Sequence, residues 1–226
     1  MKPDTVLILP GWLDSGPDHW QSQWQAAHGY TRVEQHDWAR PLRGDWIARL
    51  EDVVLAQASN VPITLVAHSL GCLLVAAWAA LSRNTHRVKC AFLVAPCDVA
   101  LEVLRPVLTS WKPTRPYSAA QPNPTMRPAG SPAPVTPKLP FRSRLLASRT
   151  DPYCSFERAQ TLAESWGSSL IDCGARGPIN GESDLGNWPY GHALLLALQR
   201  DEPASALCIE AAVLKESLAE HMKATH

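Results

Sequence analysis

The segment Ala-His-Ser-Leu-Gly at residues 67–71 constrains the fold of this chain more than any other. It joins an apolar run typical of a strand, residues 63–66, to a longer apolar run typical of a buried helix, residues 70–81. A serine at such a turn is held in a strained backbone conformation that projects its hydroxyl above the edge of a sheet. The alanine and the glycine two positions either side let the strand and the helix cross closely. Ser69 is therefore the predicted nucleophile.

The size and the charge of the chain limit the classes of protein to which it can belong. Its 226 residues suffice for one domain with a substantial core, and 21 basic side chains balance 21 acidic ones. Because no net charge would attract a polyanion, we expect no nucleic-acid partner. The longest apolar run, residues 70–81, is too short to span a membrane, so no membrane partner is expected. Residues 1–4 lead straight into a predicted strand, which favours a cytoplasmic protein without a secretory signal.

The six cysteines are scattered along the chain and form no Cys-x-x-Cys pair. Such spacing argues against a zinc site and against dithiol chemistry. We therefore expect reduced thiols in the interior, no metal and no organic cofactor. Cys72 directly follows the predicted turn, and we expect it to be unreactive because a buried helical cysteine usually is.

Strand-like and helix-like segments alternate along the chain, which is typical of a parallel sheet covered by helices on both faces. Strands are expected at Thr5–Leu9, Arg32–His36, Pro62–Ala67, Val88–Ala95, Arg144–Ser148 and Ser169–Cys173. Helices are expected at about Asp18–His28, from Asp45 as cap, at Leu70–Leu81, from Ser155 as cap, and at about Tyr190–Leu198. The chain is thus predicted to be α/β, with a six-stranded, mainly parallel sheet.

Two segments fall outside this alternation. Residues 105–140 hold half of the chain's 20 prolines, which predicts a long surface loop that cannot pack a core. This loop would be either a solvated excursion or a lip over a binding site. Apolar residues then recur at helical spacing in residues 201–226, which predicts an amphipathic extension of the main domain, residues 1–200. The extension would dock on that domain or contact a second copy or another protein, and the loop could also bind a partner.

The predicted turn matches the nucleophile elbow of the α/β-hydrolase fold, with alanine in place of the usual first glycine. In that fold the catalytic residues follow the order serine, acid, histidine, on loops at the carboxyl edge of the sheet. The third predicted strand delivers Ser69, and Asp151 follows the strand two places later. Asp151 is therefore the predicted acid, which would orient a histidine and stabilise its imidazolium form. The alternative is that this aspartate, which precedes a proline, only forms a turn.

An attacking serine also needs two backbone N–H groups aimed at the oxyanion that forms. The N–H of Leu70, at the start of the predicted buried helix, is the first candidate, because the helix dipole also favours negative charge there. The N–H of Trp12 is the second, in the loop of residues 10–17, where Gly11 permits a sharp turn. The alternative is that this loop is only a glycine-rich connector.

Several motifs together resemble those of one family. They are Pro-Gly-Trp through Asp-His-Trp-Gln at 10–21, His-Asp-Trp at 36–38, Gly-Asp-Trp at 44–46, the turn and Cys at 67–72, Leu-Pro-Phe at 139–141, Ala-Ser-Arg-Thr-Asp-Pro-Tyr at 147–153 and Gly-Asn-Trp-Pro at 186–189. The chain resembles the YdeN-like serine hydrolases, small α/β-hydrolases related to the retinoblastoma-binding protein nine hydrolase, over about residues 4–199 without much of the proline-rich loop. The resemblance implies a cofactor-free, esterase-type activity on small acyl substrates.

The chain departs from that family at the position of the base. Bacterial relatives carry a Gly-His-Ile-Asn stretch after the sixth strand, and the matching residues here, 177–180, are Gly-Pro-Ile-Asn. The resemblance therefore implies that Pro178 stands in the place of the catalytic histidine. His192, which keeps the order serine, aspartate, histidine, is the first candidate for a substitute base, and His19 is the second. We expect His68 to pack or to form a hydrogen bond beside the turn.

The sequence thus predicts a serine hydrolase of esterase type that cleaves a small acyl ester. Ser69 would attack, Asp151 and His192 would complete the triad, and the N–H groups of Trp12 and Leu70 would form the oxyanion hole. The alternative is a catalytically inactive pseudo-hydrolase that acts by binding a partner. Pro178 is the residue that favours this alternative.

Overall fold

Six runs of the chain form the strands of one sheet. In chain order they are β1 (Thr5–Leu9), β2 (Thr31–Arg32), β3 (Ile63–His68), β4 (Val88–Val94), β5 (Arg142–Ala147) and β6 (Ser169–Asp172). Every neighbouring pair is parallel, and the strands lie in the order β2-β1-β3-β4-β5-β6. All six residues of β3 are buried, as expected for a central strand that is covered on both faces.

The computed structural model describes residues 4–112 and 138–203. The predicted helical extension, residues 201–226, lies outside these ranges except for its first three residues. The centre of the proline-rich segment also lies outside them. The predicted roles of both segments in binding a partner therefore stay predictions.

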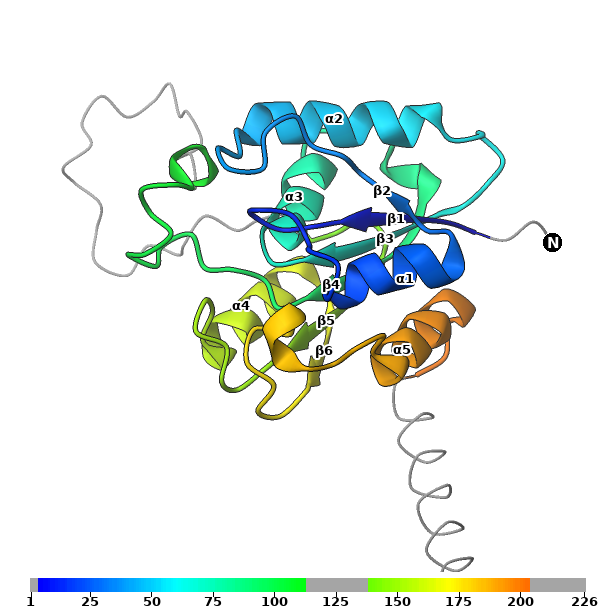
Figure 1. The fold of residues 1–226 in the computed structure, drawn as a ribbon. Coiled ribbons are helices and arrows are strands. Elements are labelled where there is room, and N and C mark those ends of the chain that lie inside the picture. The colour runs from blue at the N-terminus through cyan, green and yellow to red at the C-terminus, as the bar shows by residue number, and fades with distance from the viewer. Residues whose placement is uncertain (1–3, 113–137, 204–226) are drawn as a thin grey trace, which may run out of the picture.

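Helices cover the two faces of the sheet. In the described residues they are α1 (Trp20–His28), α2 (Arg43–Ala56), α3 (Leu70–Ala79), α4 (Phe156–Trp166) and α5 (Pro189–Arg200), with 3-10 turns η1 (Thr85–Arg87), η2 (Thr109–Trp111) and η3 (Gly181–Ser183). Buried side chains of α2, α3 and α4 form one core cluster, and those of α1 and α5 form a second. Figure 1 shows α2 and α3 on one side of the sheet and α1 and α5 on the other. The predicted α/β-hydrolase architecture is confirmed.

The two predicted helix caps have different outcomes. Ser155 caps α4 as predicted, because its hydroxyl accepts a hydrogen bond from the N–H of Arg158 at 3.2 Å. The prediction for Asp45 was wrong, since α2 begins at Arg43 and places this aspartate in its first turn. The carboxylate there still favours the positive end of the helix dipole.

The prediction that residues 105–140 cannot pack a core was wrong at both of their described ends. Leu108, Trp111 and Leu139 are buried in the cluster that contains α2, α3 and α4. The indole N–H of Trp111 also donates to the carbonyl of Pro41 at 2.7 Å. Large apolar side chains at the two ends of a proline-rich run can reach the core, because their burial is favourable.

The closest approach that positions the site lies between the end of β1 and the start of α3. A Cβ atom added to Gly71 would lie 2.3 Å from the carbonyl oxygen of Leu9, which is far inside the normal contact distance. A Cβ atom added to Gly11 would lie 2.9 Å from the Cβ of Ser69. The predicted need for a small residue at position 71 is therefore explained by backbone contact with β1.

Gly71→Ala is expected to lower the free energy of unfolding by about 1–3 kcal/mol, because the new methyl group must displace backbone. Gly44→Ala is the matched control, since a Cβ atom there meets no atom within 4 Å. Alanine in the first turn of α2 should leave stability unchanged or raise it by up to about 1 kcal/mol. Urea titrations measure the free energy of unfolding of both variants. Equal values for Gly71→Ala and Gly44→Ala would contradict the close crossing of β1 and α3.

Candidate active site

Ser69 occupies a strained backbone conformation between β3 and α3. Its φ of 51° and ψ of −117° lie in a region that side chains other than glycine rarely adopt. Its N–H donates to the carbonyl of Val94 at 3.0 Å, which ties the turn to the neighbouring strand β4. Ser69 is the N-terminal cap residue of α3, yet its hydroxyl makes no capping hydrogen bond. The turn therefore has the backbone conformation of a nucleophile elbow, and the Ser69 hydroxyl does not cap α3.

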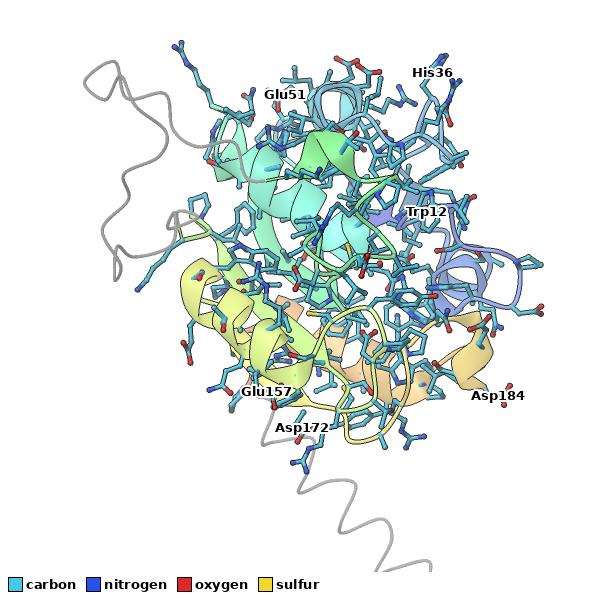
Figure 2. The ribbon with its side chains drawn as sticks, turned by 90° about the vertical axis from the view of Figure 1, so that its left-hand side faces the viewer. Trp12, His36, Glu51, Glu157, Asp172 and Asp184 are labelled. Carbon is cyan, nitrogen blue, oxygen red and sulfur yellow. The ribbon has the colours of Figure 1, made fainter. Side chains whose placement is uncertain are left out.

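A cavity of about 510 Å³ lies over this turn and contains both Ser69 and Asp151 in its lining. Its walls come from the loops after β1, β3, β4, β5 and β6, so it sits at the carboxyl edge of the sheet. Figure 2 views the molecule from this edge, and Trp12 lies there. The topology thus brings together the predicted nucleophile, the predicted acid and one predicted oxyanion residue.

Among the described residues, no cationic side chain pairs with the carboxylate of Asp151. Burial raises its pKa to about 6, although its hydrogen bonds from the N–H groups of Tyr153 and Cys154 oppose that shift. The bond from Tyr153 is 2.8 Å long. Within the described residues, no imidazole forms a hydrogen bond with this carboxylate. Asp151 is therefore placed like the acid of a triad but is not bound to a base.

The two predicted oxyanion donors are the N–H groups of Trp12 and Leu70, and Gly11 links them because it precedes Trp12 and lies close to Leu70. A Cβ atom on Gly11 would lie 3.4 Å from the nitrogen of Leu70, and Trp12 is the next residue in the chain. The indole N–H of Trp12 donates to the carbonyl of Ala39 at 3.1 Å, which anchors this loop. In the described part of the chain, the backbone N–H groups of Trp12 and Leu70 have no protein acceptor. Trp12 lines the cavity, whereas Leu70 is buried at the start of α3, directly after Ser69.

His192 does not reach the cavity, so its predicted role as the base was wrong. Its Nε2 atom forms a hydrogen bond of 2.8 Å with the hydroxyl of Tyr30. Its ring stacks on His28 with centroids 4.0 Å apart and planes 7° apart, and it meets the edge of Trp24. The start of α5 packs against α1 on one face of the sheet, which holds this imidazole away from the edge that carries Ser69.

His19 and His68 do line the cavity, and both rings are buried; each has one ring nitrogen in a hydrogen bond with the backbone, and Nε2 of His19 has no partner among the described residues. Nδ1 of His19 accepts from the N–H of Gln21 at 3.1 Å, and burial lowers its pKa to about 2, with a smaller contribution from His68. Nε2 of His68 lies 3.0 Å from the carbonyl oxygen of Pro178, and burial lowers its pKa to about 4. The expected hydrogen-bonding role of His68 is confirmed, whereas His19 is too weakly basic to serve as the predicted second candidate for the base.

The Cys97 thiol lies beside the nucleophile, and no sequence motif indicated it. This thiol contacts the Ser69 hydroxyl, but burial dominates and raises its pKa to about 12. Burial also raises the thiol pKa of Cys72 and of Cys154, so all three groups stay protonated at neutral pH. Position alone could have indicated Cys97, because it follows the strand next to β3.

Pro178 lines the cavity after β6, on the side of the carboxyl edge where the order of the triad would place a histidine. Its carbonyl accepts the bond from His68, and the next residue, Ile179, has a φ of 49°. The turn after β6 is thus bound to the elbow through a hydrogen bond, and the residue that it contributes at position 178 of the lining is a proline.

Over residues 4–112 and 138–203, no helix is long and apolar enough to cross a membrane. Within the same ranges, no group of three or more histidine, cysteine or acidic side chains is arranged to hold a metal ion.

Comparisons with known proteins agree with this geometry. The profile of the family described as serine hydrolase matches residues 6–197. A protein described as a YdeN-like hydrolase from Pectobacterium atrosepticum is 25% identical, with 88% of this chain and 92% of that chain covered and a TM-score of 0.68. The resemblance to YdeN-like hydrolases is thereby confirmed. No curated protein matches the chain.

Two structures from Bacillus subtilis share the fold. The ydeN gene product is 18% identical over 87% of this chain and 98% of its own, with a TM-score of 0.62. Carboxylesterase CesB is 13% identical over 87% of this chain and 84% of its own, with a TM-score of 0.53.

Asp151→Asn is expected to raise the free energy of unfolding by about 1 kcal/mol at about pH 8, and by less at about pH 4. Between the ordinary pKa of 3.8 and the raised value of about 6, the folded protein holds a proton that the unfolded chain has released. This carboxylate therefore lowers stability as the pH rises through that window.

Asp172→Asn is the matched control with the opposite sign. Hydrogen bonds from Arg149 and Gly174 lower the pKa of Asp172, so its carboxylate adds stability above its ordinary pKa. Urea titrations at the two pH values compare the variants. If Asp151→Asn raises the free energy of unfolding equally at the two pH values, the result would contradict a buried, unpaired carboxylate at position 151.

Proposed function

This chain belongs to the serine hydrolase family, and on that premise we propose that it is an esterase-type enzyme that acts on small acyl esters through Ser69. One observation carries the proposal: a strained serine, a carboxylate and Trp12 line a single cavity, and α3 begins directly after that serine. A turn of this strain persists only where its surroundings fix it, and such strain concentrates at functional sites.

In the proposed reaction, the Ser69 hydroxyl attacks the carbonyl carbon of the ester. The carbonyl oxygen becomes an oxyanion, which accepts hydrogen bonds from the N–H groups of Trp12 and Leu70. The start of α3 adds the positive end of its dipole at the same point. Asp151 stabilises the positive charge on the base that takes the serine proton.

The size and the lining of the cavity favour a small substrate. Its volume of about 510 Å³ lies within the usual range for small-molecule sites. Trp12, Leu13 and Tyr153 contribute apolar surface, and the side chains of Leu13 and Tyr153 are 60% and 38% exposed. These groups suit an aliphatic or aromatic acyl chain, which agrees with a fold shared by a carboxylesterase.

A binding-only pseudo-hydrolase is the second candidate function. Pro178 lines the cavity, and Asp151 has no bound imidazole within the described residues. A serine without a base loses orders of magnitude in turnover, although the oxyanion hole alone retains part of the rate. On this alternative, the cavity would hold an acyl compound without cleaving it.

Ser69 is expected to be labelled slowly by a fluorophosphonate probe, because the oxyanion hole stabilises the attack on phosphorus while no described side chain takes the serine proton. Ser69→Ala should lose the label completely. Ser155→Ala is the matched control, since Ser155 caps α4 and should leave the labelling unchanged. Intact-protein mass spectrometry follows the adduct. An unlabelled wild-type protein would favour the pseudo-hydrolase.

Pro178→His is expected to raise esterase turnover by about 10- to 100-fold, because it places an imidazole in the cavity with Ser69 and Asp151. The carbonyl at position 178 remains, so its hydrogen bond from His68 can persist. His192→Ala should leave the turnover of both backgrounds unchanged, since its ring lies outside the cavity. Steady-state hydrolysis of 4-nitrophenyl acetate measures each rate, and a large loss in His192→Ala would restore that residue as the base.

A further inference from the structure

The cavity contains a gap between the predicted nucleophile and the predicted acid. The Cys97 thiol contacts the Ser69 hydroxyl and is also close enough to Asp151 for that carboxylate to raise its pKa. Ser69 and Asp151 both line the same cavity. The hydrogen bonds that Asp151 accepts come from the backbone N–H groups of Tyr153 and Cys154, and no described imidazole or cationic side chain bonds to its carboxylate.

Neither imidazole in the cavity lining can fill this gap. Nδ1 of His19 accepts from a backbone N–H, so the neutral ring carries its proton on Nε2, where it cannot accept another. Nε2 of His68 donates to the Pro178 carbonyl, because a carbonyl can only accept. Both rings are more than nine-tenths buried. They hold the walls of the cavity in place rather than connecting Ser69 with Asp151.

The charges around the cavity favour a ligand that can become positive. Its lining includes the carboxylates of Asp14, Asp18, Asp151 and Glu182 and, among the described residues, no lysine or arginine. Asp14 pairs with Arg32, but Asp151 has no such partner. A protonated ring in this region would be stabilised by the unpaired carboxylate.

We propose that the ligand supplies the missing base: an imidazole ring, free or carried by the substrate, binds between Ser69 and Asp151. This inference rests on the proposed function and names the chemistry that completes the same site. The ring donates its N–H to the Asp151 carboxylate and presents its unprotonated nitrogen to the Ser69 hydroxyl. The volume of about 510 Å³ leaves room for an acyl group beside the ring.

The unprotonated nitrogen of the ring takes the Ser69 proton as Oγ bonds to the ester carbon and the carbonyl electron pair moves to oxygen. The resulting imidazolium donates that proton to the alcohol oxygen as the C–O bond breaks, which leaves an acylated Ser69. Water then attacks the acyl carbon and gives its proton to the same ring. The ring finally returns the proton to the Ser69 oxygen, and the acid is released.

An aliphatic amine does not fit this role. Its ordinary pKa is near 10, and a neighbouring carboxylate would keep it protonated and unable to accept the serine proton. An imidazole has an ordinary pKa of about 6.5 and two nitrogens that act in opposite directions, so it can both donate and accept at neutral pH.

The test measures hydrolysis of 4-nitrophenyl acetate at increasing concentrations of imidazole. Ser69→Ala provides the blank, because imidazole cleaves this ester in solution in direct proportion to its concentration. Above that blank, we expect the wild-type rate to rise by at least about 10-fold and to saturate. A wild-type rate that follows the blank would overturn the proposal.

Two further arms test the role of Asp151. 1-Methylimidazole can accept the serine proton but has no N–H for the carboxylate, so its saturating effect should be at least about 10-fold smaller than that of imidazole. Asp151→Asn should lose most of the imidazole effect, whereas Asp172→Asn, whose side chain does not line the cavity, should retain it. Equal effects in the two variants would overturn the placement of the ring.

Pro178→His separates failure of this inference from failure of the proposed function. If Pro178→His hydrolyses the ester and imidazole adds nothing to the wild type, the inference fails and the esterase proposal stands. If Ser69 is not labelled by fluorophosphonate, and neither Pro178→His nor added imidazole gives turnover, then both this inference and the esterase proposal fail. If Pro178→His does not fold, fluorophosphonate labelling of wild-type Ser69 takes its place in this comparison.

The source of the ring is resolved by substrates. The acetate ester of 4-(hydroxymethyl)imidazole should be cleaved without additive if the substrate carries the base, whereas benzyl acetate should then require added imidazole. Equal dependence of both esters on added imidazole identifies a free ring as the ligand. Both results support the proposal, and cleavage of neither ester under any of these conditions overturns it.

Discussion

The contact between the backbone of Gly71 and the carbonyl of Leu9 is the constraint on which the site depends. It brings the start of α3 against the end of β1, so the chain must turn sharply at Ser69. The same crossing places the loop after β1 beside the Leu70 nitrogen. One close approach between two parts of the backbone thus produces the strained serine and both candidate oxyanion donors.

Much of this arrangement could be predicted because it depends on local pattern and on topology. Apolar runs of strand length alternate with helical periodicity, and this alternation fixes a parallel sheet whose carboxyl edge collects the loops. Ser69 and Asp151 follow strands directly, so their positions at that edge could be derived without coordinates. Trp12 could be found in the same way, because it also follows a strand.

The base could not be located from the sequence, because it depends on how a long connection packs. His192 follows the sixth strand in the correct order, but α5 packs against α1, and the ring stacks on His28 instead of reaching Ser69. Spacing also gave no sign that the two ends of the proline-rich segment enter the core. There Trp111 bonds to the carbonyl of Pro41, a contact between residues that are 70 positions apart.

The candidate site therefore holds a carboxylate to which, among the described residues, no imidazole is bound. Burial raises the pKa of Asp151, and this cost is the kind that a folded protein bears where function requires it. The same feature has a kinetic consequence, because water needs a general base to attack an acylated serine. Acylation by an activated ester should then outpace deacylation.

Peptide mapping by mass spectrometry after brief incubation with 4-nitrophenyl acetate tests the central claim that Ser69 is the nucleophile. The account predicts an acetyl group that accumulates on the peptide containing Ser69, and that imidazole removes from it. Acetylation confined to lysine or cysteine side chains, with Ser69 unmodified, would contradict it.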